Sequence, residues 1–244
     1  MNISAKGKGF RELNEEIADA LRKGSRVELT EVEGHRYIGA GVGKGCTIRI
    51  HGTPGNDLGC YMDGASVEVF GNGQDAVGNT MNRGRIVVHG HAGDALGYAM
   101  RGGEIFVEGN AGYRCGIHMK EFGEARPVIV IGGTAGAFLG EYMAGGVIIV
   151  FGQSDEEVQP PAAGYCATGM HGGIMYLRGK VPSENFSSTV VVEECNKDDL
   201  AFVQRYADTF TQVFSHGPGA LRAEDFVKVR PASARPYGNL YVRN

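Results

Sequence analysis

Apolar residues return along this chain with a fixed period. Met62, Met81, Met100 and Met119 stand 19 residues apart, and two further methionines follow after 24 and 27 residues. Repetition at such a period indicates stacked structural units. The copies also align on the glycine that ends each apolar run, which gives the same spacing with two enlarged gaps. These glycines are Gly52, Gly71, Gly90, Gly109, Gly133, Gly152 and Gly179.

Two positions before each of these glycines are apolar in every copy, and the residues between them vary. Alternation with β-branched enrichment predicts strands whose apolar side chains face a common interior. The residues between and beside them, such as Arg49 and His51, are expected to face solvent or a partner. The two columns are Ile48, Val67, Ile86, Ile105, Ile129, Ile148 and Met175, and Ile50, Val69, Val88, Val107, Ile131, Val150 and Leu177.

A glycine phrase follows each strand, complete as GxxGxxxG in copies such as Gly90/Gly93/Gly97. The residue before the third glycine is apolar or small, and the returning Met closes the phrase. Both add an inward column, which makes four per repeat. A repeat of 19 extended residues covers roughly 60 Å, the perimeter of one coil. The sequence therefore predicts an all-β fold, a right-handed parallel β-helix of about seven coils.

The two ends of the stack require covers, because terminal coils expose apolar cross-sections. A degenerate first coil is expected at 27–45. Upstream, Leu13, Ile17 and Leu21 lie on one face of a predicted capping helix that Gly24 ends.

A second helix is expected near the C-terminus, beginning at Asp198 or Asp199 and ending at about Ser215. It is expected to pack on the stack or on a partner. The predicted domains are a capping helix at 1–26, the β-helix at 27–181, and a C-terminal helix with an extended tail at 182–244.

The composition of the chain argues against two classes of partner, nucleic acids and membranes. The 24 basic and 28 acidic residues give a net charge of −4 without long runs, which argues against nucleic acid as a partner. The N-terminus lacks the apolar core of a signal peptide, and no apolar run reaches about 18 residues. We therefore expect no membrane partner and a cytoplasmic location.

The repeated glycine phrases resemble a known domain. With segments such as 51–57, 78–82, 97–103 and 140–146 in register, the chain is similar to the C-terminal GXGXG β-helix domain of the glutamate synthase large subunit. The resemblance covers about residues 27–181 and extends to the N-terminal helix and to the tail that begins at Phe226. The C subunit of formylmethanofuran dehydrogenase shares this stack, so the resemblance is compatible with either complex.

This resemblance implies a noncatalytic structural or scaffolding subunit of a split glutamate synthase-like complex. Its partners are then a glutaminase-type amidotransferase subunit and a synthase subunit that carries FMN and an iron–sulfur cluster. It implies no cofactor and no catalytic, cofactor-binding or metal-binding residue on this chain. Two alternatives stay open: a C-subunit-like component of formylmethanofuran dehydrogenase, and a stand-alone carbohydrate-active β-helix enzyme. Self-association into a homo-oligomer also stays open.

The cysteines do not predict a cluster, because the five of them are dispersed and form no CxxC pair. Cys115 and Cys166 share a column but stand two coils apart, which is about 10 Å and too far for a disulfide. Core packing is expected for both. The chain also begins Met1-Asn2-Ile3, without the N-terminal cysteine that a glutaminase of this type needs.

Histidines offer a second candidate site. His51 and His89 share a column with Phe70 between them, and His118 and His171 are expected near one corner of a coil. Since no carboxylate joins these histidines at metal-ligand spacing, a metal site is not the favoured interpretation.

Asn56, Asp75 and Asp94 occupy one column in successive coils. Carboxylates about 4.8 Å apart repel one another and favour a bound cation or acid/base chemistry, as in some β-helix enzymes. The favoured interpretation is that these side chains bond their own turns. No adjacent run of aromatic sugar platforms is evident in the sequence, and Trp is absent.

Overall fold

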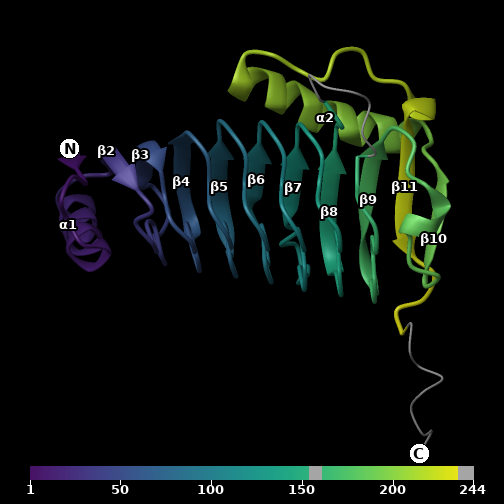
Figure 1. Cartoon of the computed structure of the whole chain (residues 1–244), viewed down its shortest axis with the longest axis horizontal. Helices are drawn as coiled ribbons and strands as arrows, with labels where there is room; N and C mark the ends of the chain where they lie inside the picture. Colours follow the sequence, from purple (N-terminus) through teal and green to yellow (C-terminus); the bar gives the residue numbers. More distant parts are fainter. Residues whose placement is uncertain (154–160, 236–244) are drawn as a thin grey trace, which may run out of the picture.

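The computed structural model describes residues 1–153 and 161–235, which form one continuous 11-stranded sheet wound into a stack of coils (Figure 1). The strand order is β1-β2-β3-β4-β5-β6-β7-β8-β9-β11-β10. From β2 to β9, each strand pairs in parallel with the next along the chain, so the predicted parallel β-helix is confirmed. The elements are β1 (Asn2–Ser4), α1 (Phe10–Lys23), β2 (Arg26–Glu33), β3 (Thr47–Thr53), β4 (Asp63–Phe70), β5 (Arg83–Val88), β6 (Glu104–Val107), β7 (Val128–Ile131), β8 (Ala144–Val150), β9 (Gly172–Arg178), η1 (Ser183–Asn185), β10 (Val190–Glu194), α2 (Lys197–Phe214), η2 (Ala223–Asp225) and β11 (Phe226–Pro231).

The strand register reproduces the columns aligned from the sequence. Ile48 pairs with Val67, which pairs with Ile86, and the ladder continues without a break to Met175. The predicted first coil is also present, because Val27 of β2 pairs with Ile48. All four inward columns, including the methionines, are fully buried. Side chains therefore fill the interior of each coil.

The glycine phrases form the remaining wall of each coil through alternating left-handed residues. In one coil Ala95, Gly97 and Ala99 have φ of +55°, +66° and +51°. The alternation turns successive N–H groups in opposite directions along the stack. The N–H groups of Ala95 and Ala99 donate to Tyr113 and Ile117 in the next coil, and that of Gly97 donates to Val77 in the preceding coil. Each coil is thus bonded to both neighbours outside its strands as well.

The third glycine of the phrase is required by close packing as well as by its left-handed backbone. A Cβ atom on Gly97 would lie 2.4 Å from Cδ1 of Ile129, which points inward from β7. The same contact recurs between Gly78 and Ile105. The last copy has Ala167 in this column, at φ +62°. Ala is accommodated there because the parallel stack ends at β9.

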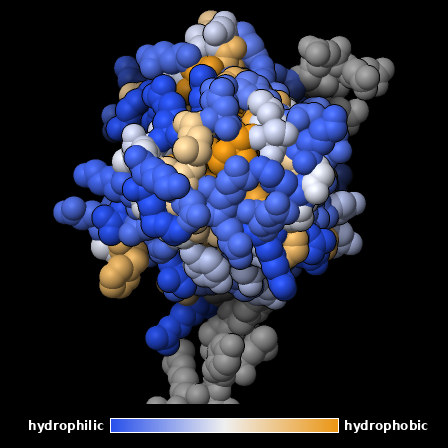
Figure 2. All heavy atoms as spheres, turned by 90° about the vertical axis from the view of Figure 1, so that its left-hand side faces the viewer, coloured by the Kyte–Doolittle hydropathy of each residue, from blue (hydrophilic) through white to orange (hydrophobic). Residues whose placement is uncertain are grey.

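The N-terminal end of the stack is covered by α1 and β1. Leu13, Ile17 and Ala20 of α1 are buried in the main core, and Leu21 packs partly against it, so the predicted capping helix is confirmed. Strand β1 adds a parallel edge strand to β2. Viewed from this end, the surface is mostly hydrophilic, with a small apolar area near its centre (Figure 2).

Helix α2 lies across the strands on the outer face of the sheet, along the direction of the stack (Figure 1). Its apolar residues form a second core with the outward side chains of β5 to β9. Phe210 packs edge-on against Phe151 at 5.5 Å, and Tyr206 lies 6.4 Å from Phe106. The outward column is charged at Arg49 but apolar from Val87 onward. The second core explains this change.

The start of α2 differs from the prediction, because Asn196 rather than Asp198 or Asp199 caps the helix. The Asn196 side chain accepts hydrogen bonds from the N–H groups of both aspartates, each at 2.9 Å. The Asp199 carboxylate in turn accepts the N–H of Asn196 at 3.1 Å. This reciprocal capping box satisfies the first free N–H groups of the helix.

A buried polar network ties this helix start to the sheet. The Asp199 carboxylate accepts the hydroxyl of Tyr176 on β9 at 2.8 Å and contacts Nζ of Lys228 on β11 at 3.1 Å. Burial opposes ionisation of Asp199, but hydrogen bonds from Asn196, Tyr176 and Lys228 outweigh it and hold the pKa of the carboxyl below its usual value. Burial and the Asp199 carboxylate raise the pKa of the Tyr176 hydroxyl.

The tail after the C-terminal helix was predicted to be extended. Its residues Phe226–Pro231 are extended, but they form strand β11, which pairs antiparallel with both β9 and β10. This hairpin covers the C-terminal coil. Among the described residues, no helix combines the length and apolar character of a membrane span.

Gly97→Ala should destabilise the protein by about 2–4 kcal/mol, since it adds a clash with Ile129 to left-handed strain. Gly123 provides a matched control, because it has a similar φ of +60° and an added Cβ would meet nothing within 4 Å. Gly123→Ala should cost only about 1 kcal/mol. Urea unfolding of both variants measures the difference, and equal losses would contradict the packing argument.

Stability should depend on pH through Asp199. Because its pKa is lowered in the folded state, its contribution is present above the unfolded value of 3.8 and is lost as the pH falls below it. The difference in melting temperature between wild type and Asp199→Asn should therefore shrink between pH 7 and about pH 3. Asp198→Asn, whose side chain is outside the network, is the control. A gap that stays constant with pH would exclude the ionised network.

Candidate functional site

The cysteines are positioned as structural residues. Cys115 and Cys166 are fully buried in their common column, as predicted for core packing. Burial raises the pKa of Cys166 to about 12, and it also raises that of Cys115. Thiols with raised pKa values stay protonated and are poor nucleophiles and metal ligands. None of the five cysteines forms a disulfide.

His51 and His89 take part in an aromatic ladder on the outer face of the first coils. The ring of Phe70 lies between them, with centroid distances of 4.8 and 4.9 Å and nearly parallel planes. Phe214, the last residue of α2, then meets His89 edge-on at 5.1 Å. The two histidines are therefore separated by a stacked ring, as their shared column predicted.

Each histidine of this ladder is bonded to a glutamate side chain. Nε2 of His51 lies 2.7 Å from Glu28, and Nε2 of His89 lies 3.1 Å from Glu68. The hydrogen bond with His51 lowers the pKa of Glu28. Glu108 is bonded to His216, just after α2, at 2.6 Å. The sequence did not indicate these pairs. The first two join residues on neighbouring coils, and the Glu108–His216 pair fixes the segment after α2 to the sheet.

In the column of Asn56, Asp75 and Asp94, the two aspartate side chains form bonds between coils. Oδ1 of Asp75 accepts the N–H of Asp94 at 3.0 Å, and Oδ1 of Asp94 accepts the N–H of Tyr113 at 2.8 Å. The expectation that these side chains bond their own turns is thus wrong for Asp75 and Asp94. In a parallel stack the same position of the next coil lies about 4.8 Å away, and each acceptor serves the N–H group there. Asn110 makes the equivalent bond to Thr134 at 2.9 Å.

His118 and His171 have separate partners in the structure. His118 stacks on Tyr142, with a centroid distance of 5.4 Å and an interplanar angle of 9°, and meets Tyr98 edge-on at 5.9 Å. Nδ1 of His171 lies 3.1 Å from the carbonyl oxygen of Gly169. In the ranges 1–153 and 161–235, no group of three or more His, Cys, Asp or Glu side chains is arranged to hold a metal ion.

His118 belongs to a larger cluster on the glycine-phrase side of the later coils. Phe138 stacks on Tyr165 at 4.9 Å, and the guanidinium of Arg114 lies 4.9 Å from the centre of the Phe138 ring. Arg114 also pairs with Glu141 at 2.9 Å. We name this cluster the aromatic face. It comprises Tyr98, Tyr113, Arg114, His118, Phe138, Tyr142 and Tyr165.

The aromatic face is exposed although packing does not require large side chains there. Tyr165 and Tyr113 are 66% and 54% exposed. Arg114, Phe138 and Tyr165 occupy a left-handed position that holds Tyr37, Asp57, Ala76 and Ala95 in the four earlier coils. The two coils directly before Arg114 have alanine there. Since alanine suffices for the coil, the bulky residues indicate a surface role. Tyr, Phe and Arg are typical of the centres of protein interfaces.

The sequence did not reveal the aromatic face, because its aromatic residues are not adjacent in the chain. The stacked rings come from neighbouring coils and are 24 or 27 residues apart. A signal was present in the column two residues before the third glycine, where Asp57, Ala76 and Ala95 are followed by Arg114, Phe138 and Tyr165. This change becomes visible only when the copies are aligned in the way that identified the inward residues.

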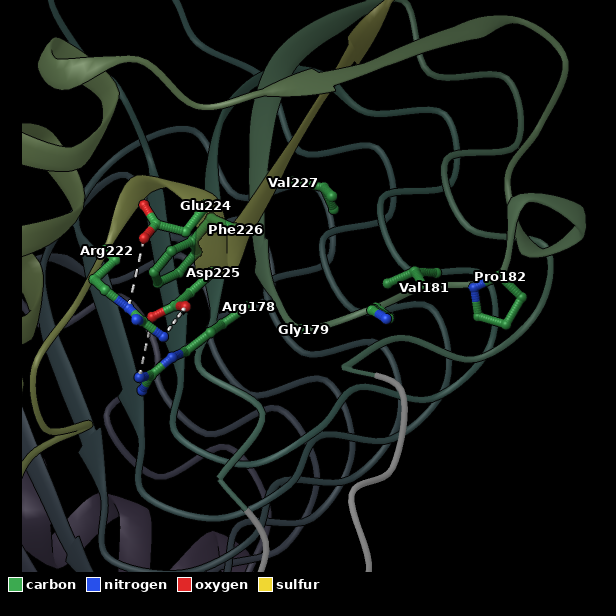
Figure 3. Close-up of a pocket in the computed structure, with 10 residues that line it drawn as sticks. Arg178, Gly179, Val181, Pro182, Arg222, Glu224, Asp225, Phe226 and Val227 are labelled. Carbon is green, nitrogen blue, oxygen red and sulfur yellow. Dashed lines mark hydrogen bonds and ion pairs between the residues drawn. The ribbon is translucent and has the colours of Figure 1, made fainter.

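An open cleft of about 790 Å³ lies at the C-terminal end of the stack (Figure 3). Its charged side chains are largely paired with one another. Asp225 contacts Arg222 at 3.1 Å and Arg178 at 3.6 Å, and Arg178 also donates to the carbonyl oxygen of Ala220 at 3.0 Å. These contacts hold the segment before β11 against β9. The side chains that line the cleft therefore mainly close the end of the stack.

The two enlarged gaps in the glycine spacing contain inserts, and these differ in what the structure describes. The first, at 120–127, forms a short hairpin on the outside of the stack, as expected of an insert. Most of the second, at 153–163, lies outside the described residues, since 154–160 are not among them.

Comparisons with known proteins agree with this architecture. The sequence pattern of the GXGXG motif family matches residues 11–231. The chain is 40% identical over 249 aligned residues to an uncharacterized protein of Methanocaldococcus jannaschii, and the alignment covers 98% of this chain and 95% of that protein. The fold is similar to a chain of the formyltransferase/hydrolase complex from Methylorubrum extorquens, solved by X-ray crystallography in complex with methylofuran. That likeness has a TM-score of 0.59 at 21% identity and covers 87% of this chain and 84% of the other.

Substitutions at Asp94 should separate a structural role from cation binding. Asp94→Ala removes the acceptor for the Tyr113 N–H and should cost about 0.5–1.5 kcal/mol. Asp94→Asn retains an acceptor oxygen and should cost less than about 0.5 kcal/mol. Thermal unfolding with and without calcium measures both effects. A calcium-dependent stabilisation that Asp94→Asn abolishes would instead assign the column to a cation.

Proposed function

The chain belongs to the GXGXG motif family, and from this premise we propose that it is a noncatalytic structural subunit of a multi-subunit enzyme complex. In this role it holds partner subunits in fixed relation, and the chemistry takes place on those partners. The observation that carries the proposal is the aromatic face, where Arg114, Phe138 and Tyr165 follow Ala76 and Ala95 at the same position of the coil. A surface of this composition suits contact with another protein.

The interior of the stack supports a structural role. The inward columns are fully buried and packed with Ile, Val, Leu and Met. Hydrogen bonds join each coil to both neighbours. A filled and continuously bonded rod holds the groups on its surface at fixed separations, which is what a scaffold between subunits requires.

Our first candidate is a split glutamate synthase-like complex, as the repeated glycine phrases imply. The partners are then a glutaminase-type amidotransferase subunit and a synthase subunit that carries FMN and the iron–sulfur cluster. Core burial and raised thiol pKa values make Cys115 and Cys166 poor cluster ligands. This supports our proposal that the cluster lies on a partner subunit, and we propose the same for FMN.

A second candidate has its own support. The similar fold in the formyltransferase/hydrolase complex favours a role like that of the C subunit of formylmethanofuran dehydrogenase. In both candidates this chain is a structural component, and the identity of the neighbouring subunits distinguishes them.

Isolation of the tagged chain from its native cell tests the proposal. We expect stoichiometric partner subunits, identified by mass spectrometry, and flavin absorbance with glutamine-dependent glutamate formation in the intact complex. A formyl-transferring complex without flavin would instead select the second candidate. The chain purified alone should be colourless and lack glutaminase activity. Stoichiometric flavin on the isolated chain, or a chain without partner subunits, would overturn the proposal.

A further inference from the structure

The insert at 120–127 is a rigid hairpin that the repeat itself does not need. The N–H groups of Phe122 and Ala125 each donate to the carbonyl oxygen of the other residue at 3.1 Å. Oε2 of Glu121 accepts the N–H of Gly146 at 3.1 Å and lies 3.5 Å from Nε of Arg126. These bonds fasten the hairpin to the neighbouring coil.

Arg126 fastens the other side of the hairpin to α2, with its guanidinium 5.6 Å from the centre of the Phe202 ring. The hairpin is therefore held between the stack and the helix. It presents Phe122 with 84% of its surface exposed, which is the highest value among the large apolar residues in the described part of the chain. A side chain held out in this way is available as an anchor without a large cost in ordering.

Phe122 borders an open cleft of about 430 Å³ at the corner that follows the buried methionines. We call this surface the basic corner. Its lining combines three cationic side chains with one amide, one carboxylate and the hairpin. The residues are Asn82, Arg83, Arg101, Lys120, Glu121, Phe122 and Ala125.

The charges of the basic corner are not balanced within the described chain. Arg83 is paired with Asp63 at 3.0 Å, but Arg101 and Lys120 have no ion pair among the residues described. Glu121, the carboxylate of the lining, is used by Gly146 and Arg126. Glu124 lies at the hairpin turn, outside the lining.

This concentration of positive charge contrasts with the net charge of −4 of the whole protein. An exposed apolar anchor beside two unpaired cations is complementary to an apolar pocket bordered by carboxylates. The basic corner also adjoins the aromatic face, because His118 and Lys120 lie on either side of the buried Met119.

We propose that the basic corner is the docking site for a partner subunit whose surface has an apolar pocket for Phe122 and acidic residues for Arg101 and Lys120. The inference rests on the proposed function, because it requires that partner subunits exist. It goes further by naming the surface and the chemistry of the partner that meets it. Repeat geometry explains why an insert serves this purpose: it places an anchor outside the coil without disturbing the inward columns.

The test uses the tagged full-length chain expressed in its native cell, with bound subunits quantified after isolation. Phe122→Ala and the double variant Arg101→Glu/Lys120→Glu should retain the wild-type melting temperature and lose at least tenfold of the bound partner. Matched controls are Tyr61→Ala, which removes another exposed aromatic ring, and Arg11→Glu/Lys23→Glu, which makes the same charge change on α1. Both controls should keep the partner to within twofold.

A photo-crosslinking phenylalanine analogue at position 122 identifies what docks there. The expected product joins this chain to a partner-subunit peptide with neighbouring Asp or Glu residues. Folded Phe122 and Arg101/Lys120 variants that keep the partner to within twofold would overturn the inference and leave the proposed function standing. A crosslink to a second copy of this chain would overturn it in favour of self-association. A wild-type chain that carries no partner would overturn the proposed function itself.

Discussion

The close approach of neighbouring coils is the constraint on which this structure depends. A Cβ atom on Gly84 would lie 2.2 Å from the carbonyl oxygen of Ala65 in the preceding coil, and one on Gly55 would lie equally near Gly34. Backbone in such contact leaves no room for side chains at fixed points of the coil. The repeated phrase and many of the 40 glycines follow from this spacing. Extra residues leave the coil as inserts.

The same constraint explains how much of the fold the sequence revealed. Every coil faces the same neighbours, so each inward position repeats in register, and Ile48 to Met175 pair as aligned. The capping helix was equally predictable, because Leu13 and Ile17 mark its buried face. At Asn196 the sequence offered two aspartates nearby as rival caps. The reciprocal bonds of Asn196 and Asp199 decide between them only in three dimensions.

Outward positions were less predictable, because their surroundings differ from one coil to the next. The change from Arg49 to Val87 in an outward column signals cover by α2, but it does not state which segment provides it. Arg114, Phe138 and Tyr165 show the same difficulty on the glycine-phrase side. Their contacts join side chains from successive coils. The positions of the inward residues, in contrast, follow from the register of the repeat. Candidate functional residues on a solenoid are thus recognised by departures from the repeat.

Helix α2 divides the rod into two mechanically different parts. It acts as a splint, since one continuous element packs against β5 to β9, while the described residues of β2 to β4 contribute nothing to this second core. The splinted part is therefore expected to resist bending more strongly than the coils before it. The aromatic face from Tyr98 onward and the basic corner occupy the coils that this splint spans or adjoins. Subunits bound there would keep their separation, and any hinge in the assembly would lie toward the N-terminal coils.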